Sequence, residues 1–201
     1  MARKRNTLPL ILASGSPRRR AILKQHGISF RVIVSEVSEN HPRPCPPPAR
    51  LVRILALKKG LAVAKHYPEH LVLSADTLVF VDGKPIGKPR DAKDGARMLR
   101  RLSGRWQDVY TGVAVAWAGG RRHFQGVARS RVLFRTLTDD DINRAASQHL
   151  DKAGGYAVQE KKDGFVKKIT GDYDNVVGLP MRVVKKLLLR GRRAHALTKR
   201  I

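Results

Sequence analysis

Hydrophobic and polar residues follow two periods along this chain, one typical of strands and one typical of helices. Short apolar runs predict strands, whereas apolar residues three or four positions apart predict amphipathic helices. The strands are expected at residues 8–13, 30–34, 71–81, 108–118, 122–136 and 165–169. The helices are expected at residues 18–26, 49–66, 91–102, 138–148 and 179–189. This order predicts an α/β fold in which helices flank a mixed, twisted sheet.

Residues with special backbone preferences mark several element ends. Ser16 suits the N-cap of the first helix, with Pro17 in its first turn and Gly27 as its stop. The dipeptide Asp82-Gly83 predicts a tight hairpin turn after the long apolar strand. The segment 138–141 begins with threonine and ends with aspartate, the pattern of a helix start. These signals indicate where strands and helices are joined.

Charge and size add constraints on partners and compartment. The chain has 201 residues, with 41 Lys and Arg against 16 Asp and Glu and a net charge of +25, so its partners should be anions. We expect one domain over residues 1–201, with basic termini at about 1–7 and 190–201. A single cysteine, Cys45, excludes an internal disulfide and favours a reducing cytoplasm. No apolar run approaches the roughly 18 residues of a membrane span.

The segment 14–20, Ser-Gly-Ser-Pro-Arg-Arg-Arg, follows the first predicted strand and opens the first helix. Free backbone N–H groups, hydroxyls and guanidinium groups meet there, a combination that suits a phosphate chain. The alternative is a plain helix cap with solvated arginines. The chain has neither a Walker phosphate loop nor a dinucleotide-binding glycine motif.

Asp76 interrupts an otherwise apolar strand, where Ser74 to Thr77 break the run. A buried carboxylate is costly unless it meets a cation, a metal or several donors, so Asp76 is a candidate functional residue. Glu36 or Glu39 of the early loop could join it around Mg²⁺, which prefers carboxylates and substrate phosphates. Either glutamate alone could instead be a solvated loop residue.

Three further segments are candidates for substrate contacts. Lys88 lies on a stiff loop after the strand of Asp76 and suits a phosphate. In the segment 151–159, the amide of Gln159 could recognise a base edge, although an ordinary loop is the alternative. The segment 175–180 is interpreted as a turn that starts the last helix. Neither zinc-protease nor nucleophile-elbow spacing occurs.

Taken together, these segments resemble the Maf family of nucleoside triphosphate pyrophosphatases over about residues 10–189. The matching motifs are S-x-S-P-R-R at 14–19, A-D-T at 75–77, G-K-P at 87–89, D-K-A-G-x-Y-x-x-Q at 151–159 and N-V-V-G-L-P at 175–180. The resemblance implies a fold like inosine triphosphate pyrophosphatase, with two lobes around a cleft. It also implies a homodimer without membrane association.

The resemblance implies a role for each candidate residue. Residues that would bind the substrate are Ser14, Ser16, Arg18, Arg19, Lys59, Thr77, Lys88 and Gln159. Asp76 would be the catalytic carboxylate, as general base or as ligand of Mg²⁺ or Mn²⁺, with Glu39 as a second metal ligand. The A-D-T motif and Gln159 are similar to the branch that hydrolyses dTTP and UTP to the monophosphate and pyrophosphate.

The sequence is also compatible with other interpretations. Gln107 stands where the family usually has histidine, and Glu160 stands where glycine is usual. The branch that acts on 7-methyl-GTP is one alternative. A non-enzymatic protein that binds nucleic acid through its basic surface and tails is another. A role in regulating growth or division is a third, and sequence does not separate it from nucleotide hydrolysis.

Overall fold

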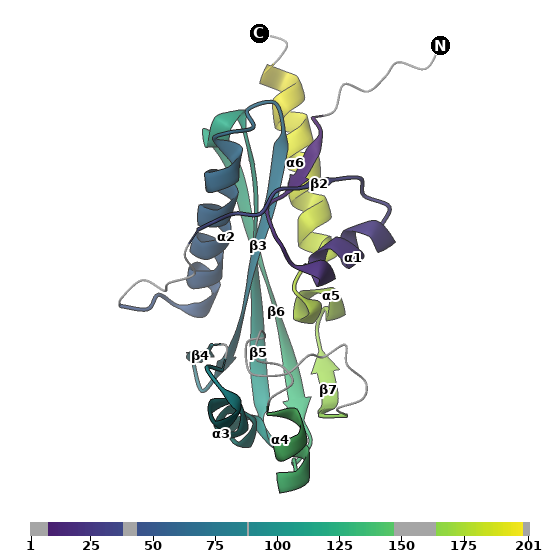
Figure 1. Cartoon of the computed structure of the whole chain (residues 1–201). Coiled ribbons are helices and arrows are strands. Elements are labelled where there is room, and N and C mark those ends of the chain that lie inside the picture. Colours follow the sequence, from purple (N-terminus) through teal and green to yellow (C-terminus); the bar gives the residue numbers. More distant parts are fainter. Residues whose placement is uncertain (1–7, 38–43, 88, 147–163, 199–201) are drawn as a thin grey trace. The chain divides into compact units, whose positions relative to one another are not determined.

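The computed structural model describes residues 8–37, 44–87, 89–146 and 164–198. The chain divides into two compact units. Unit 1 comprises Met1–Asp76, Gly112–Val127 and Met181–Ile201, and unit 2 comprises Thr77–Thr111 and Ala128–Pro180. Figure 1 shows the helices and strands of the chain, coloured along the sequence.

The strands confirm the predicted mixed sheet. They are β1 (Leu10–Leu12), β2 (Arg31–Val32), β3 (Leu71–Val81), β4 (Lys84–Ile86), β5 (Trp106–Trp117), β6 (Arg122–Phe134) and β7 (Val166–Thr170). In unit 1, β1 pairs in parallel with both β2 and β3. In unit 2, β3 pairs with β4 and β6 pairs with β7, both antiparallel. Residues of β3, β5 and β6 belong to both units.

The helices confirm most of the expected positions. They are α1 (Pro17–Gln25), α2 (Pro48–Ala64), α3 (Ala92–Leu102), α4 (Asp139–Ala145), α5 (Tyr173–Val177) and α6 (Met181–Thr198), with a short 3₁₀ turn η1 (Ala118–Gly120). Ser16 caps α1, and Gly27 follows that helix with a φ of 65°. Thr138 and Asp141 form a capping box at α4. No helix in the described part of the chain is long and apolar enough to cross a membrane.

One sequence expectation at the strands was confirmed and one at the last helix was wrong. The strand predicted at 71–81 is β3, which continues through residues 74–77 with Asp76 buried within it. Residues 190–198, expected to belong to a basic tail, are instead part of α6, which extends to Thr198. Gly191 is buried in that helix, and a Cβ there would lie 3.3 Å from Val115 and 3.4 Å from Leu71. Packing against the strands therefore stabilises the helical conformation at this glycine, and the helix continues beyond it.

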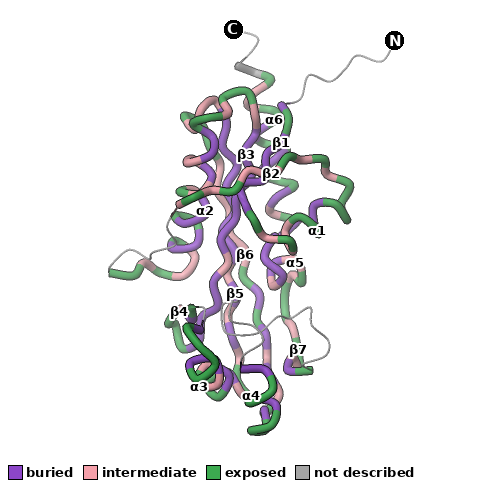
Figure 2. Tube along the Cα trace, viewed as in Figure 1, coloured by how far each residue is buried: buried purple, intermediate pink, exposed green. Residues whose placement is uncertain are grey.

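Buried apolar residues of the strands and helices form the core of each unit. Figure 2 colours the buried residues along the trace. In unit 1, buried residues of β1, β3, α2 and β5 cluster around Ile11, Val63, Val72 and Ala116. Unit 2 has its own cluster: Val79, Val81, Ile86, Leu99, Leu102, Val109, Val132, Phe134, Leu137, Ile142, Ala145 and Phe165. Unit 1 holds most of the candidate site residues that the structure describes.

Candidate active site

The turn between β1 and α1 is held in place by hydrogen bonds to the hydroxyl groups of its two serines. Ser14 is buried, and its Oγ accepts hydrogen bonds from Arg19 Nη1 at 3.1 Å and from the Ser16 backbone N–H at 3.3 Å. Ser16 Oγ accepts the Arg19 backbone N–H at 3.5 Å. The two serines therefore fix the turn and the start of the helix, and Ser14 orients one guanidinium group.

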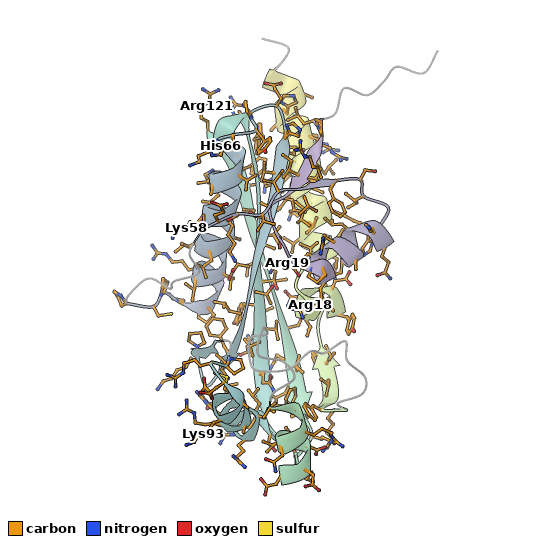
Figure 3. All side chains as sticks on the ribbon, viewed as in Figure 1. Arg18, Arg19, Lys58, His66, Lys93 and Arg121 are labelled. Carbon is orange, nitrogen blue, oxygen red and sulfur yellow. The ribbon has the colours of Figure 1, made fainter. Side chains whose placement is uncertain are left out.

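Positive charge is concentrated at the start of α1. The first turn of this helix carries no acidic residue, and the positive end of the helix dipole lies there. Arg18 and Arg19 are both half-buried, and Figure 3 labels them in the first turn of α1. Backbone N–H groups and guanidinium forks together suit a phosphate group, which accepts hydrogen bonds from both.

Asp76 and Lys59 form a buried ion pair in unit 1. Lys59 Nζ on α2 donates to Asp76 Oδ1 on β3 at 2.6 Å, and the side chains are 12% and 9% exposed. Asp76 Oδ2 is buried and has no hydrogen-bond partner among the described residues. One oxygen of the carboxylate is thus held by a cation, while the other remains available to accept a proton or contact a metal ion.

Close backbone packing fixes α2 in the position that brings Lys59 to Asp76. Ser74 Oγ donates to the Ala56 carbonyl oxygen at 2.7 Å, and a Cβ on Gly60 would meet that hydroxyl at 2.5 Å. A Cβ on Gly112 of β5 would lie 2.1 Å from the Val52 carbonyl oxygen. Sequence analysis missed these contacts, although a glycine inside a strand signals a close backbone approach.

Strand register places the serine turn beside the segment of Asp76. Leu12 pairs with Leu73, and the Ala13 backbone N–H donates to the Leu73 carbonyl oxygen at 2.8 Å. Adjacent strands lie about 4.8 Å apart. The turn that starts at Ser14 therefore begins one strand spacing from the residues that lead into Asp76. Both segments belong to unit 1, so one compact body carries the carboxylate, its lysine and the arginines.

A metal site can be tested against the described acids. Among these residues, no group of three or more His, Cys, Asp or Glu side chains could hold a metal ion. Asp76 nevertheless offers the buried, unpartnered Oδ2. Glu36 is exposed in the described part of the early loop. Asp76 by itself fits a hard cation that takes a single carboxylate from the protein and otherwise binds phosphate oxygens and water.

Thr77 lies at the edge of unit 2, where it belongs to a hydrogen-bonded set. Its Oγ1 is 3.0 Å from Thr111 Oγ1 and donates to the Gly178 carbonyl oxygen at 3.4 Å. Asn175 of α5 is fully buried and donates from Nδ2 to the Val109 carbonyl oxygen and to Ser130 Oγ, both at 3.0 Å. Asn175 to Val177 belong to α5, whose C-cap is Gly178. The segment 175–180 therefore comprises the end of a short helix and the turn before α6, and is not a turn throughout as expected.

Several candidate residues lie outside the described part of the chain. They are Glu39, Lys88 and Gln159, together with the remainder of the segment 151–159 and Glu160. Their roles therefore stay predictions from the sequence.

Gln107 of β5 lies in the part of unit 2 that the structure describes. Its side chain is 1% exposed, and neither Nε2 nor Oε1 has a hydrogen-bond partner within the described residues. An amide buried without partners costs free energy. Within the described part of the chain, Gln107 is therefore an unsatisfied polar group in the interior of unit 2.

Comparison with known proteins agrees with the motifs. The family described as Maf-like protein matches residues 9–190. A protein named dTTP/UTP pyrophosphatase from Moorella thermoacetica is 49% identical over 183 residues, covering 89% of this chain and 93% of its own. Another of that name from Elusimicrobium minutum is 40% identical over 181 residues, covering 90% and 97%.

Among solved structures, a HAM1 protein from Coxiella burnetii aligns with 12% identity and a TM-score of 0.47, covering 79% of this chain and 91% of its own. The family match extends over most of the chain and includes the serine–arginine turn, Lys59 and Asp76. The chain belongs to the Maf-like protein family.

Proposed function

We propose that this protein is a nucleoside triphosphate pyrophosphatase that hydrolyses dTTP and UTP, and modified pyrimidine forms of them, to the monophosphate and pyrophosphate. The observation that carries the proposal is the buried Asp76 carboxylate, held on one oxygen by Lys59 and unpartnered on the other. Membership of the Maf-like family and relatives named dTTP/UTP pyrophosphatase support the choice of substrate. Because the family match runs through both units, we treat the chain as a single Maf-like domain.

The reaction is an attack of water on the α-phosphorus. A bond forms from the water oxygen to phosphorus, the bond to the bridging oxygen of the β-phosphate breaks, and pyrophosphate leaves with that oxygen. Asp76 Oδ2 accepts the proton of the attacking water, while Lys59 holds the carboxylate in place through Oδ1. Catalysis then depends on positioning the water and stabilising the negative charge of the phosphates, and the reaction needs no covalent intermediate.

The negative charge of the triphosphate opposes both binding and attack. Arg18, Arg19 and the N-terminus of α1 donate hydrogen bonds to phosphate oxygens, and the Ser14 contact orients Arg19 before the substrate arrives. Ser16 stabilises this end of the helix as its N-cap, by accepting the backbone N–H of Arg19. We also assign a phosphate contact to Lys88, on the strength of its sequence motif alone.

A divalent cation, Mg²⁺ or Mn²⁺, would be held by Asp76 and by Glu39. It would supply charge neutralisation at the phosphates. The buried Asp76 Oδ2 fits this role as the alternative to its role as the base, while Glu39 rests on the family resemblance. Gln159 and Thr77 are proposed to select the pyrimidine, because an amide can pair with a carbonyl and an N–H together. A homodimer also stays a prediction, which light scattering of the purified protein would test.

The proposal is tested by measuring pyrophosphate release from dTTP, UTP, 7-methyl-GTP and the common purine triphosphates, with Mg²⁺ and with Mn²⁺. We expect dTTP and UTP to be the best substrates. Asp76→Asn should lower release by about 10²- to 10⁴-fold while leaving the circular dichroism spectrum unchanged.

Glu69→Gln is the matched control for that variant, because Glu69 is an exposed acid of the same unit. It should hydrolyse dTTP at the wild-type rate. Retention of most activity by Asp76→Asn would refute the role of this carboxylate. A clear preference for 7-methyl-GTP would refute the proposed substrate class.

A further inference from the structure

Helix α6 presents a continuous row of cations on its outer surface. Its sequence contains no acidic residue. The exposed basic side chains of the helix are Arg182, Lys185, Lys186, Arg190, Arg192 and Arg193. Arg182, Lys186, Arg190 and Arg193 are spaced by three or four residues, so they line one face of the helix. We call Arg182, Lys185, Lys186, Arg190 and Arg193 the α6 stripe.

The opposite face of α6 is buried in the core of unit 1. Met181, Val184, Leu187 and Leu188 are buried, as is Gly191. A Cβ on Gly126 of β6 would lie 2.6 Å from Val183, so the helix packs directly on the strands (Figures 1 and 2). This packing leaves the stripe as the solvent-facing surface of a helix whose orientation within the unit is fixed.

The cations of the stripe are not neutralised by the part of unit 1 that the structure describes. The acids there are Glu36, Glu69 and Asp76, and Asp76 is paired with Lys59. None of the stripe residues forms an ion pair with a described carboxylate. Like charges three or four residues apart repel one another and destabilise a helix. A polyanion that binds along the stripe would relieve this repulsion.

The end of α1 extends the basic surface. Lys185 Nζ lies 3.3 Å from His26 Nδ1, which brings the last turn of α1 beside α6. That turn carries the exposed Lys24. Arg190 covers the ring of Phe124, with its guanidinium carbon 4.2 Å from the ring centroid. Basic side chains from two helices therefore contribute to one surface of unit 1.

The dimensions and composition of the stripe favour the backbone of a nucleic acid duplex. From Arg182 to Arg193 the helix rises about 16 Å, at 1.5 Å per residue. Laid parallel to the duplex axis, this length spans about five phosphates of one strand, at 3.4 Å of axis for each phosphate. Single strands are normally held by exposed aromatic rings that stack on bases, and the basic face of α6 has no aromatic residue.

A membrane surface suits the stripe less well than a duplex. Helices that lie on a bilayer insert a free apolar face into it. The apolar face of α6 is buried against strands, and Leu189, at 51% exposed, is the large apolar side chain left on the outer side of this helix. We propose that the α6 stripe is a sequence-independent docking surface for the phosphate backbone of duplex nucleic acid, separate from the Asp76 carboxylate and the serine–arginine turn.

The test measures binding of the full-length protein to a labelled 20-base-pair duplex by fluorescence anisotropy, across a series of salt concentrations. DNA and RNA duplexes are compared in parallel arms. The variant Arg182→Gln/Lys186→Gln/Arg193→Gln should lose at least tenfold in affinity at low salt. The slope of log K against log salt should fall by about 2 to 3, since three phosphate contacts are removed.

The matched control removes the same charge from unit 2. Lys84, Lys93 and Lys168 are exposed there. The affinity of Lys84→Gln/Lys93→Gln/Lys168→Gln for the duplex should be within about twofold of that of the wild type. This change is well below the tenfold loss of affinity expected for the stripe variant. The charge-preserving variant Arg182→Lys/Lys186→Arg/Arg193→Lys should retain binding, which separates charge from any effect on folding. All variants should give circular dichroism spectra of the wild type.

Three results would overturn the docking surface. Equal losses in the two triple-glutamine variants would show that bulk charge is responsible. Absence of duplex binding by the wild type at 50 mM salt would show that no such surface exists. Binding to vesicles of phosphatidylcholine with one-third phosphatidylserine, without binding to either duplex, would assign the stripe to a membrane.

Discussion

The two units of this chain use charged residues in contrasting ways. In unit 2, most described acids are paired with arginines. The pairs join Asp94 to Arg90 and Arg97, Asp108 to Arg129 and Arg131, Asp141 to Arg135 and Arg144, Asp82 to Arg105 and Asp139 to Arg100. In unit 1, the ion pair between described residues is that of Lys59 with Asp76.

This difference separates charges that stabilise the fold from charges that are available to a ligand. Asp141 accepts from Arg135, Arg144 and the Thr138 backbone N–H, so its oxygens are fully used by the protein. Asp76 has one oxygen used and one unpartnered. A carboxylate with spare hydrogen-bonding capacity in a buried position is therefore a better guide to chemistry than a count of acids.

The largest effect should come from breaking the pair in unit 1. Lys59→Met removes the cation that orients Asp76, and we expect kcat/KM for dTTP to fall by about 10²- to 10³-fold, as for the loss of other preorganised electrostatic contacts. Lys58→Met is the control, because Lys58 is its exposed neighbour on α2, pointing away from the strands (Figure 3). Equal losses in both variants would argue against a specific role for the pair.

A second comparison uses one glycine in each unit. Gly112→Ala would place a Cβ 2.1 Å from the Val52 carbonyl oxygen, and Gly95→Ala would place one 2.5 Å from that of Ala146. Both should lower the free energy of unfolding, by about 3 kcal/mol for Gly112 and by about 1–3 kcal/mol for Gly95. Urea denaturation measures both changes.

Activity distinguishes these two glycine variants further. Gly112 contacts α2, the helix that carries Lys59, so Gly112→Ala should also lower pyrophosphate release at a temperature where the protein is still folded. Gly95→Ala should spare release under those conditions, because α3 and α4 carry no proposed active-site residue. The opposite pattern would show that α2 is not positioned by its contact with Gly112.

The ion pairs of unit 2 should determine stability in acid. The side chain of Arg135, followed by the Thr138 backbone N–H, holds the pKa of Asp141 well below its ordinary value. The Arg90 backbone N–H and the Arg97 side chain lower the pKa of Asp94. Because these pKa values are lower in the folded state, the stabilisation is present above about pH 4 and is lost as pH falls below it.

Asp141→Asn tests this pH dependence. The variant should lower the free energy of unfolding by about 1 kcal/mol at pH 7, since the capping contacts of α4 are weakened. It should also show a smaller loss of stability between pH 5 and pH 3 than the wild type, in thermal unfolding followed by circular dichroism. An unchanged slope would mean that other carboxylates dominate acid unfolding.

The smallest expected effect concerns the buried amide of unit 2. Gln107→Met keeps the shape of the side chain and removes two polar atoms that lack partners in the described structure. We expect the free energy of unfolding to rise by about 1 kcal/mol, with dTTP hydrolysis unchanged. A destabilised variant would indicate that the amide is hydrogen-bonded in solution.

Much of the fold could be predicted because its signals are local. Ser16, Pro17 and Gly27 mark the ends of α1, and Asp82-Gly83 forms the turn between β3 and β4. The short helix α5 was not predicted, since Tyr173 to Val177 has too few residues for a helical period to appear. The continuation of α6 beyond Gly191 was missed because packing on Val115 and Leu71 outweighs the local preference of glycine.

The sequence established the elements, the excess of cations and the motifs that resemble a family, because each depends on residue types and on spacings of a few positions. The tertiary structure decided which of these residues meet. Lys59 and Asp76 are 17 residues apart, and they pair because Gly60 and Gly112 let α2 approach the strands. Asn175 donates a hydrogen bond to the carbonyl oxygen of Val109, which lies 66 residues earlier in the chain. Such contacts depend on packing between distant elements, and no local pattern specifies them.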